Sequence, residues 1–142
     1  MAVRSFLATI FCLSLLAACA GTEAADTAGA TCDQFRATPA IEQSRAIEVG
    51  TDLVIVLCSN PSTGFSWGDP QISDTSVVRL IDRTFRAAGE SSAPIVGAPG
   101  DEVLTIRGVA SGTTTLSIGY GQPWAGGTQG EWTYDLTVTV RS

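Results

Sequence analysis

Residues 131–141 read Glu131-Trp-Thr-Tyr-Asp-Leu-Thr-Val-Thr-Val-Arg141, and apolar and polar side chains alternate along the whole stretch. Because successive side chains of a β-strand point to opposite faces, this period of two predicts a strand with one buried face. The side chains expected in the core are those of Trp132, Tyr134, Leu136, Val138 and Val140.

Shorter patterns of the same kind occur upstream, separated by turns rich in Gly, Pro, Ser and Thr. They predict strands at residues 45–49, 53–57, 77–82, 102–108 and 113–120. The chain has no convincing long helical period, so we expect an all-β fold, an immunoglobulin-like β-sandwich. Residues 53–57 are apolar on both faces, and we expect the segment before residue 45 to cover their outer face.

The first 18 residues are expected to be a secretory signal peptide, since Arg4 precedes an apolar run at 6–18. A membrane-spanning helix needs about 20 residues, which is more than this run provides. The run ends in Leu-Ala-Ala-Cys19, similar to bacterial lipoprotein signals, so Cys19 is expected to carry acyl chains. The alternative is ordinary cleavage next to an incidental cysteine. Lipid at Cys19 would anchor the chain to a bacterial membrane outside the cytoplasm, at the cell surface or in the periplasm.

Residues 19–36 are small and polar without an apolar period, so we expect a flexible tether before a single domain at 37–142. Of the four cysteines, Cys12 leaves with the signal and Cys19 is acylated. Cys32 and Cys58 are therefore expected to form a disulfide, which persists in an oxidising compartment. The alternative is two buried free thiols.

Composition excludes several classes of function. The chain has 14 acidic residues, 8 basic residues and no histidine, and all its basic residues are arginines. We expect no nucleic-acid partner, because no basic patch is present. The absence of histidine and lysine removes imidazole bases, histidine metal ligands and lysine nucleophiles. The acidic residues show no calcium-loop pattern. We therefore expect no enzyme activity, no metal and no cofactor.

Two segments at predicted strand ends have the composition of stiff loops. In residues 60–65, Asn-Pro-Ser-Thr-Gly-Phe, Pro61 fixes its own φ and Gly64 permits a turn that a side chain would resist. Residues 122–126, Gln-Pro-Trp-Ala-Gly, place Trp124 at a loop tip, where a large aromatic is typical of an interface anchor. Rigid loops lose little entropy on docking, which favours binding to a cleft. Phe65 and Trp67 share one side of the chain and are expected in the core.

Three ordered motifs resemble those of the chagasin family of cysteine-peptidase inhibitors. Residues 60–65 stand where the family has Asn-Pro-Thr-Thr-Gly and an aromatic residue. Residues 97–100, Gly-Ala-Pro-Gly, stand where it has Gly-x-Gly-Gly. Residues 120–126 stand where it has a tyrosine at a strand end followed by Arg-Pro-Trp-x-Gly. The resemblance covers residues 45–142.

The resemblance implies three loops side by side at one end of the sandwich. It also implies reversible, non-covalent inhibition of papain-like cysteine peptidases by a monomer that fills the active-site cleft. Thr63, with Ser62 beside it, would lie near the catalytic cysteine and histidine, and Trp124 against an aromatic surface close to that histidine. The residues expected to bind the peptidase are Asn60, Pro61, Ser62, Thr63, Gly64, Phe65, Gly97, Gly100, Pro123, Trp124 and Gly126.

Two departures from the family's motifs are expected to weaken binding. Pro99 replaces a glycine and removes an N–H group, and Gln122 replaces an arginine and loses a charge. We therefore expect the first loop to contribute most of the affinity. The alternative function is an envelope-anchored, immunoglobulin-like adhesion or carbohydrate-binding module, because a fold does not determine a function.

Overall fold

The computed structural model describes residues 26–88 and 99–142, and within these ranges the strands form two sheets. The first sheet has the order β1-β3-β7-β6, made of β1 (Asp26–Ala30), β3 (Asp52–Ser59), β7 (Gly100–Gly108) and β6 (Val78–Ala87). The second has the order β2-β9-β8-β4, made of β2 (Ala40–Glu48), β9 (Trp132–Arg141), β8 (Gly112–Gly121) and β4 (Ser66–Trp67), with β5 (Gln71–Ile72) also paired to β8. The two short helices of these ranges are α1 (Cys32–Ala37) and η1 (Pro61–Thr63). Neither has the length and apolar character needed to cross a bilayer.

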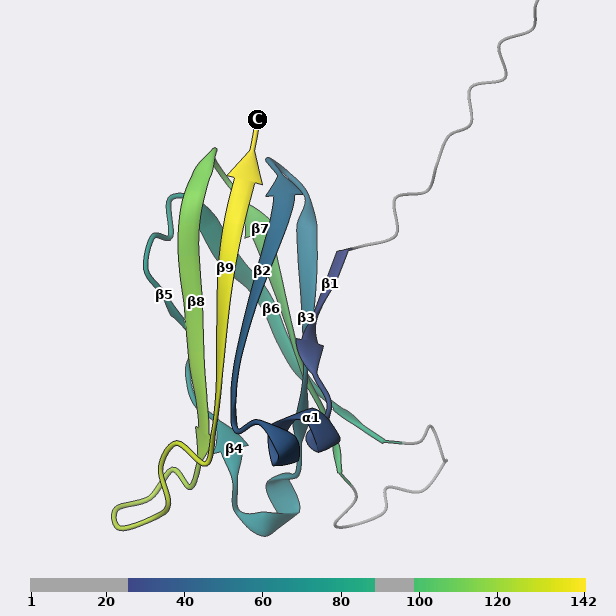
Figure 1. Ribbon diagram of the computed structural model, residues 1–142, viewed down its shortest axis with the longest axis vertical. Helices are drawn as coiled ribbons and strands as arrows, with labels where there is room; N and C mark the ends of the chain where they lie inside the picture. Colours follow the sequence, from purple (N-terminus) through teal and green to yellow (C-terminus); the bar gives the residue numbers. More distant parts are fainter. Residues whose placement is uncertain (1–25, 89–98) are drawn as a thin grey trace, which may run out of the picture.

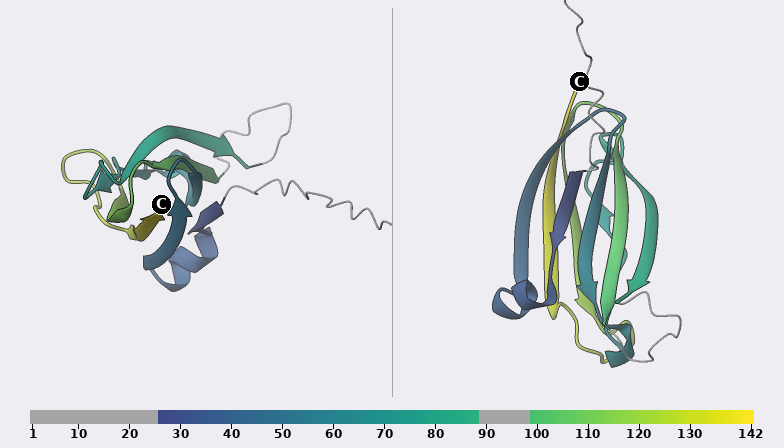
Figure 2. Two further views of the ribbon diagram at one scale, coloured as in Figure 1. Left: turned by 90° about the horizontal axis from the view of Figure 1, so that it is seen from above. Right: turned by 90° about the vertical axis from the view of Figure 1, so that its right-hand side faces the viewer.

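The two sheets face each other, as Figures 1 and 2 show, and the predicted all-β sandwich is confirmed. The pairs β1·β3 and β2·β9 are parallel, and the other strand pairs of the described ranges are antiparallel. Every strand expected from the sequence is present, although most are longer than predicted. The largest differences are in β2, which begins at Ala40 and not at residue 45, and in β6, which ends at Ala87 and not at residue 82.

The core between the sheets follows the alternation of β9. Tyr134, Leu136, Val138 and Val140 are buried and Trp132 is partly buried, as predicted. Full burial of an aliphatic side chain of this size contributes about 1.5–3 kcal/mol. The Tyr134 hydroxyl donates a hydrogen bond to Gln43 Oε1 at 2.9 Å, and burial raises its pKa to about 12, so the hydroxyl keeps its proton.

The N-terminal segment of the domain is folded, and the prediction of a flexible tether over residues 19–36 is wrong for residues 26–36. β1 pairs with β3 in parallel and adds an edge strand to the first sheet. It does not cover the outer face of residues 53–57, where Val54 and Val56 remain half-buried. Gln43 of β2 ties β1 to the second sheet, since it accepts the Gly29 N–H at 3.1 Å and donates to the Gly29 carbonyl at 2.9 Å.

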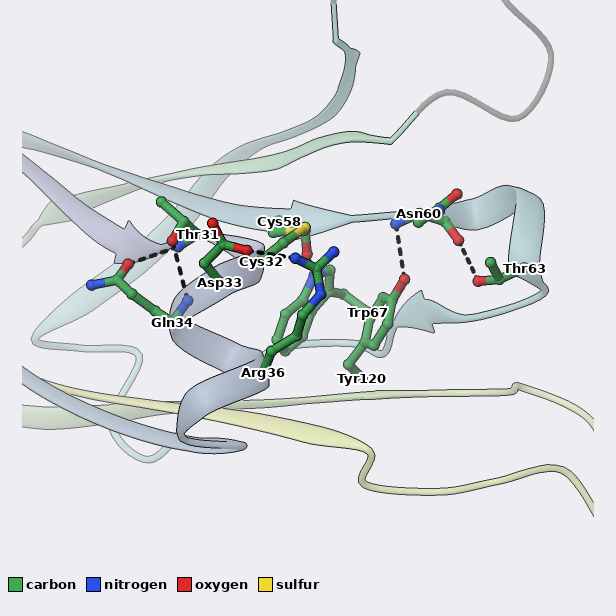
Figure 3. Close-up of a disulfide and its surroundings, with 10 residues drawn as sticks. All are labelled: Thr31, Cys32, Asp33, Gln34, Arg36, Cys58, Asn60, Thr63, Trp67 and Tyr120. Carbon is green, nitrogen blue, oxygen red and sulfur yellow. Dashed lines mark hydrogen bonds and ion pairs between the residues drawn. A yellow bond between two sulfur atoms is a disulfide. The ribbon is translucent and has the colours of Figure 1, made fainter.

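The helix α1 lies at the lower end of the sandwich in Figure 1. It begins with a capping box, in which Thr31 Oγ1 accepts the Gln34 N–H at 3.3 Å and the Thr31 N–H donates to Gln34 Oε1 at 2.8 Å (Figure 3). The disulfide between Cys32 and Cys58 links α1 to β3 across a Cα–Cα distance of 5.1 Å. This pairing was predicted and is confirmed. The expected signal peptide and the lipid at Cys19 lie outside the described residues.

Candidate functional site

The predicted binding loops leave the sandwich at one end. The first loop, residues 60–65, connects β3 to β4, and the last loop, residues 122–131, connects β8 to β9. Figure 1 shows both loops at the lower end of the sandwich, where β6 also ends and β7 begins. The strands therefore bring together segments that are far apart in the sequence. Gly97 of the predicted middle loop lies outside the described residues.

The first loop is curled on itself around the backbone of Asn60. The Asn60 carbonyl accepts the Thr63 N–H at 3.2 Å and the Thr63 hydroxyl at 2.7 Å, and Asn60 Oδ1 accepts the Ser62 hydroxyl at 2.6 Å. The Gly64 N–H donates to the Pro61 carbonyl at 3.1 Å, and Gly64 has a left-handed φ of 79°. Local hydrogen bonds thus hold the loop while Pro61, Ser62 and Thr63 stay exposed.

Aromatic rings fix the base of the first loop. The Asn60 N–H donates to the Tyr120 hydroxyl at 2.8 Å (Figure 3), so a residue of β8 holds the start of the loop. The rings of Phe65 and Trp67 lie 5.7 Å and 5.0 Å from that of Tyr120. The indole N–H of Trp67 donates to the Cys58 carbonyl at 2.9 Å inside the core. Trp67 is buried as predicted, and the half-buried Phe65 supports the loop through this packing.

The last loop is braced by one of its own side chains. Gln122 Oε1 accepts the Thr128 N–H at 3.0 Å, and the Gln122 N–H donates to the Thr128 carbonyl at 2.7 Å. The Gln122 carbonyl accepts Gln129 Nε2 at 2.5 Å. Sequence reasoning treated Gln122 only as a missing charge and did not identify this bracing role. No local pattern indicates this role, because the partners Thr128 and Gln129 lie further along the loop than the Pro-Trp-Ala-Gly motif.

Trp124 joins the last loop to the first. Its side chain is 50% exposed, as predicted for an interface anchor. A Cβ on Gly64 would lie 2.6 Å from Cη2 of Trp124, so the indole ring rests against the backbone of the first loop. Pro123 is exposed beside it, and Gly126 has a left-handed φ of 81° with no atom near its missing Cβ. The exposed parts of the two loops therefore form one continuous surface, called here the loop surface.

The middle loop meets the sandwich at Pro99, whose carbonyl accepts the Ala88 N–H at 3.0 Å. The next residue, Gly100, is buried in β7. A Cβ there would lie 2.3 Å from the Arg86 carbonyl oxygen and 2.6 Å from Cζ of Phe85. The close approach of the neighbouring strand therefore requires glycine at this position, and the contact of Gly100 with a peptidase stays a prediction.

Arg83 of β6 clamps the chain just after the first loop. Its guanidinium donates to the carbonyls of Trp67 at 2.7 Å and Gly68 at 3.0 Å. It also pairs with the carboxylates of Glu102 at 2.5 Å and Asp69 at 3.3 Å. Arg83 therefore ties the first sheet to β4 of the second. No local sequence pattern distinguishes Arg83 from the other arginines, so sequence reasoning missed it.

Comparison with protein families matches residues 46–138 to the chagasin family of peptidase inhibitors, family I42. The chain belongs to this family. Amoebiasin-2 of Entamoeba histolytica is 33% identical over 91 residues, which cover 63% of this chain and 72% of the relative. Chagasin of Trypanosoma cruzi is 30% identical over 84 residues, which cover 56% and 73%. Membership identifies the chain as a peptidase inhibitor and not an enzyme, and it decides against the adhesion alternative.

Solved structures of related inhibitors have the same fold. The crystal structure of the cysteine protease inhibitor EhICP2 from Entamoeba histolytica matches with a TM-score of 0.63 and 23% identity, over 82% of this chain and 95% of that one. The structure of PbICP-C in complex with falcipain-2 matches with a TM-score of 0.52 and 19% identity, over 83% and 93%. The chagasin-like sandwich is thus established by geometry as well as by sequence.

Proposed function

We propose that this chain, as a monomer, inhibits papain-like cysteine peptidases reversibly and without a covalent bond by filling the active-site cleft with its loops. The observation that carries the proposal is the loop surface, in which Trp124 rests on Gly64 beside the exposed first loop. Two similar folds support it, since EhICP2 is a cysteine protease inhibitor and PbICP-C was solved bound to falcipain-2.

The first loop has the chemistry to occupy a catalytic centre without reacting. The Thr63 hydroxyl donates its one proton to the Asn60 carbonyl, so its oxygen can only accept further hydrogen bonds. Such an acceptor suits a protonated imidazole in the cleft. Residues 61–63 form the turn of helix η1, so they do not present an extended strand. An extended conformation is the one in which a peptide pairs through its backbone with a binding edge. Inhibition therefore depends on blocking the cleft.

Preorganisation supplies the affinity in this proposal. Both loops are closed by internal hydrogen bonds before a peptidase is present. Little backbone ordering is therefore left to oppose binding, and the exposed ring of Trp124 provides apolar area to bury. Large aromatic side chains in such a position are frequent hot spots of interfaces.

The direct test is a titration of papain with residues 20–142, read out with a fluorogenic peptide. We expect saturable inhibition that is lost on dilution, and weaker inhibition for Thr63→Ala. The matched control is Thr113→Ala, an exposed threonine in β8 at the opposite end of the sandwich, which leaves inhibition unchanged. An absence of inhibition at micromolar concentrations would count against the proposal.

We also propose that the inhibitor is held by lipid at Cys19 on a bacterial membrane, outside the cytoplasm. The signal Leu-Ala-Ala-Cys19 supports this. Only residues 20–25 separate Cys19 from β1, and a chain of that length spans at most about 25 Å. β1 begins away from the loop end in Figure 1, so the anchor is attached at a distance from the loops.

Detergent partitioning of the expressed protein tests the anchor. Cys19→Ser is expected to move the protein from the detergent phase to the aqueous phase. Cys12→Ser, a change of the same type within the apolar run of the signal, is expected to leave partitioning unchanged. Equal partitioning of the Cys19→Ser variant and the unchanged protein would refute lipid attachment at this residue.

A further inference from the structure

A ladder of aromatic rings lies beneath the loop surface, and its first ring comes from α1. Phe35 is fully buried, with 0% of its side chain exposed. Its ring stacks on Trp132 at 5.1 Å with an interplanar angle of 11°, and it packs against Trp67 at 5.3 Å. Trp132 in turn stacks on Tyr120 at 4.7 Å and 11°. We call Phe35, Trp132, Tyr120 and Trp67 the aromatic ladder.

The ladder connects α1 to both loops through a few contacts. Tyr120 precedes the last loop on β8 and accepts the N–H of Asn60, with which the first loop begins. Trp132 begins β9 and therefore follows the last loop. A displacement of Phe35 is thus passed through two stacked rings to the residues at which the loops leave the sandwich. Pairs of stacked rings of this kind contribute about 0.5–1.5 kcal/mol beyond their burial.

Three further links hold Phe35 in place. The Cys32–Cys58 disulfide joins α1 to the end of β3, directly before the first loop. The capping box fixes the start of α1, and the bonds between Gln43 and Gly29 fix β1 across the two sheets. Residues 26–37 are therefore bound to the sandwich by covalent and non-covalent contacts, and α1 lies at the end where the loops lie.

We propose that residues 26–37 are a positioning element for the inhibitory loops and that Phe35 is its main positioning residue. This inference rests on the proposed function. The segment precedes residues 46–138, the part of the chain that matches the family, so the family motifs alone do not include it. With Phe35 in the ladder, the loops are ordered before a peptidase binds, and less conformational entropy is lost on binding.

The first experiment needs no peptidase. In residues 20–142, we compare amide order parameters at Thr63 and Gly64 between the unchanged protein and Phe35→Ala. The matched control is Ile47→Ala, which removes a buried side chain of β2 at the opposite end of the sandwich. We expect lower order in the first loop for Phe35→Ala and unchanged order for Ile47→Ala.

The second experiment measures inhibition of papain by the same proteins. We expect Phe35→Ala to weaken inhibition about tenfold, mainly through faster dissociation, because ordering of the loops is then completed only on binding. Ile47→Ala is expected to change inhibition by less than about twofold at a comparable loss of melting temperature. Phe35→Leu, which retains apolar volume without the ring, is expected to recover part of the loss.

The paired change Cys32→Ser with Cys58→Ser gives a second measure of the same element. It keeps Phe35 but removes the covalent link, and we expect a loss of inhibition smaller than that of Phe35→Ala. Should Phe35→Ala fail to fold, Phe35→Leu and this pair decide the question. Unchanged loop order and unchanged inhibition in these variants would overturn the inference, as would an equal effect of Ile47→Ala. If the unchanged protein does not inhibit papain, the proposed function fails, and the order parameters alone decide the positioning role.

Discussion

The first and the last loop share one surface but are held in place by different means. The first loop is held by its own hydrogen bonds and also from below, because Tyr120 of β8 holds Asn60 and the aromatic rings pack beneath it. The last loop is fixed from within, because Gln122 closes it through three hydrogen bonds that stay inside the loop. The loops touch where Trp124 rests on Gly64.

This difference indicates which variants should disturb one loop and which should disturb both. A change in the buried aromatic rings should loosen both loops, because Tyr120 and Trp132 lie where the loops leave the sandwich, whereas a change at Gln122 should open the last loop alone. A change at the contact between them should affect both. Inhibition of papain and stability, measured side by side, distinguish these cases.

The largest effect is expected at the shared contact, for Trp124→Ala. Truncation of a hot-spot aromatic costs about 2–4 kcal/mol, which corresponds to a rise in the inhibition constant of about 30-fold or more. Because the ring is half exposed, the free energy of unfolding should change little. Val109→Ala, an exposed apolar residue between β7 and β8, is the control and should leave inhibition unchanged. A loss below about 0.5 kcal/mol would exclude Trp124 from the hot spots of the interface.

The next effect is expected for Gly64→Ala, which disturbs the same contact from the first loop. An alanine at a φ of 79° is strained by about 1–2 kcal/mol, and its Cβ would lie 2.6 Å from the indole ring. We expect an inhibition constant about tenfold higher. Gly50→Ala is a matched control, since Gly50 has a φ of 84° and no atom within 4 Å of its missing Cβ. Both variants should lose stability in urea, and equal inhibition by both would show that the Gly64–Trp124 contact is unimportant.

A smaller effect is expected for Gln122→Ala, which opens the last loop alone. Loss of one hydrogen bond to a backbone N–H costs about 1 kcal/mol, so inhibition should weaken severalfold. Gln122→Arg places the family's residue in the motif, but a guanidinium cannot accept the Thr128 N–H. We therefore expect no gain in inhibition from the arginine. Stronger inhibition by Gln122→Arg would show that the charge matters more than the brace.

The smallest effect concerns a charge pair far from the loops, at the start of β3. Hydrogen bonds from Arg107 at 2.6 Å and 2.9 Å hold the pKa of Asp52 below its ordinary value. Because the pKa of Asp52 is lower in the folded state, its ionised carboxylate adds to the free energy of unfolding above about pH 4. This contribution is lost as the pH falls through the folded-state pKa. Because both side chains are substantially exposed, the contribution should be small.

Urea unfolding between pH 2 and pH 7 measures this contribution. In the Asp52→Asn variant, the free energy of unfolding should fall slightly less steeply as the pH is lowered. Inhibition at pH 6 should be unchanged. A change in inhibition would mean that the opposite end of the sandwich is coupled to the loop surface, which would contradict the independence of the two regions.

Local signals made part of this molecule predictable. The alternation in residues 132–140 was sufficient to predict β9 and its buried face, because strand periodicity is visible within one segment. The stiffness of residues 60–65 could be predicted because Pro61 restricts its own φ and Gly64 permits a left-handed φ, and neither effect depends on tertiary contacts. The exposure of Trp124 and the Cys32–Cys58 bridge were predicted from loop position and from the number of cysteines.

Contacts between distant segments explain what could not be predicted. Residues 26–36 looked like a tether because one phenylalanine among small and polar residues gives no period, yet its ring fits beneath Trp132 and Trp67. The packing role of Gly100 could not be predicted, because the ring of Phe85 that leaves no room for a Cβ there lies on the neighbouring strand.

The sequence alone determined the strands, the loop motifs and the membership of an inhibitor family, because each depends on residues close together in the chain. The tertiary structure decided how the loops are held: the Tyr120–Asn60 bond, the Arg83 clamp and the ladder that begins at Phe35. These contacts join residues that only the packing of the two sheets brings together, so no local pattern can reveal them.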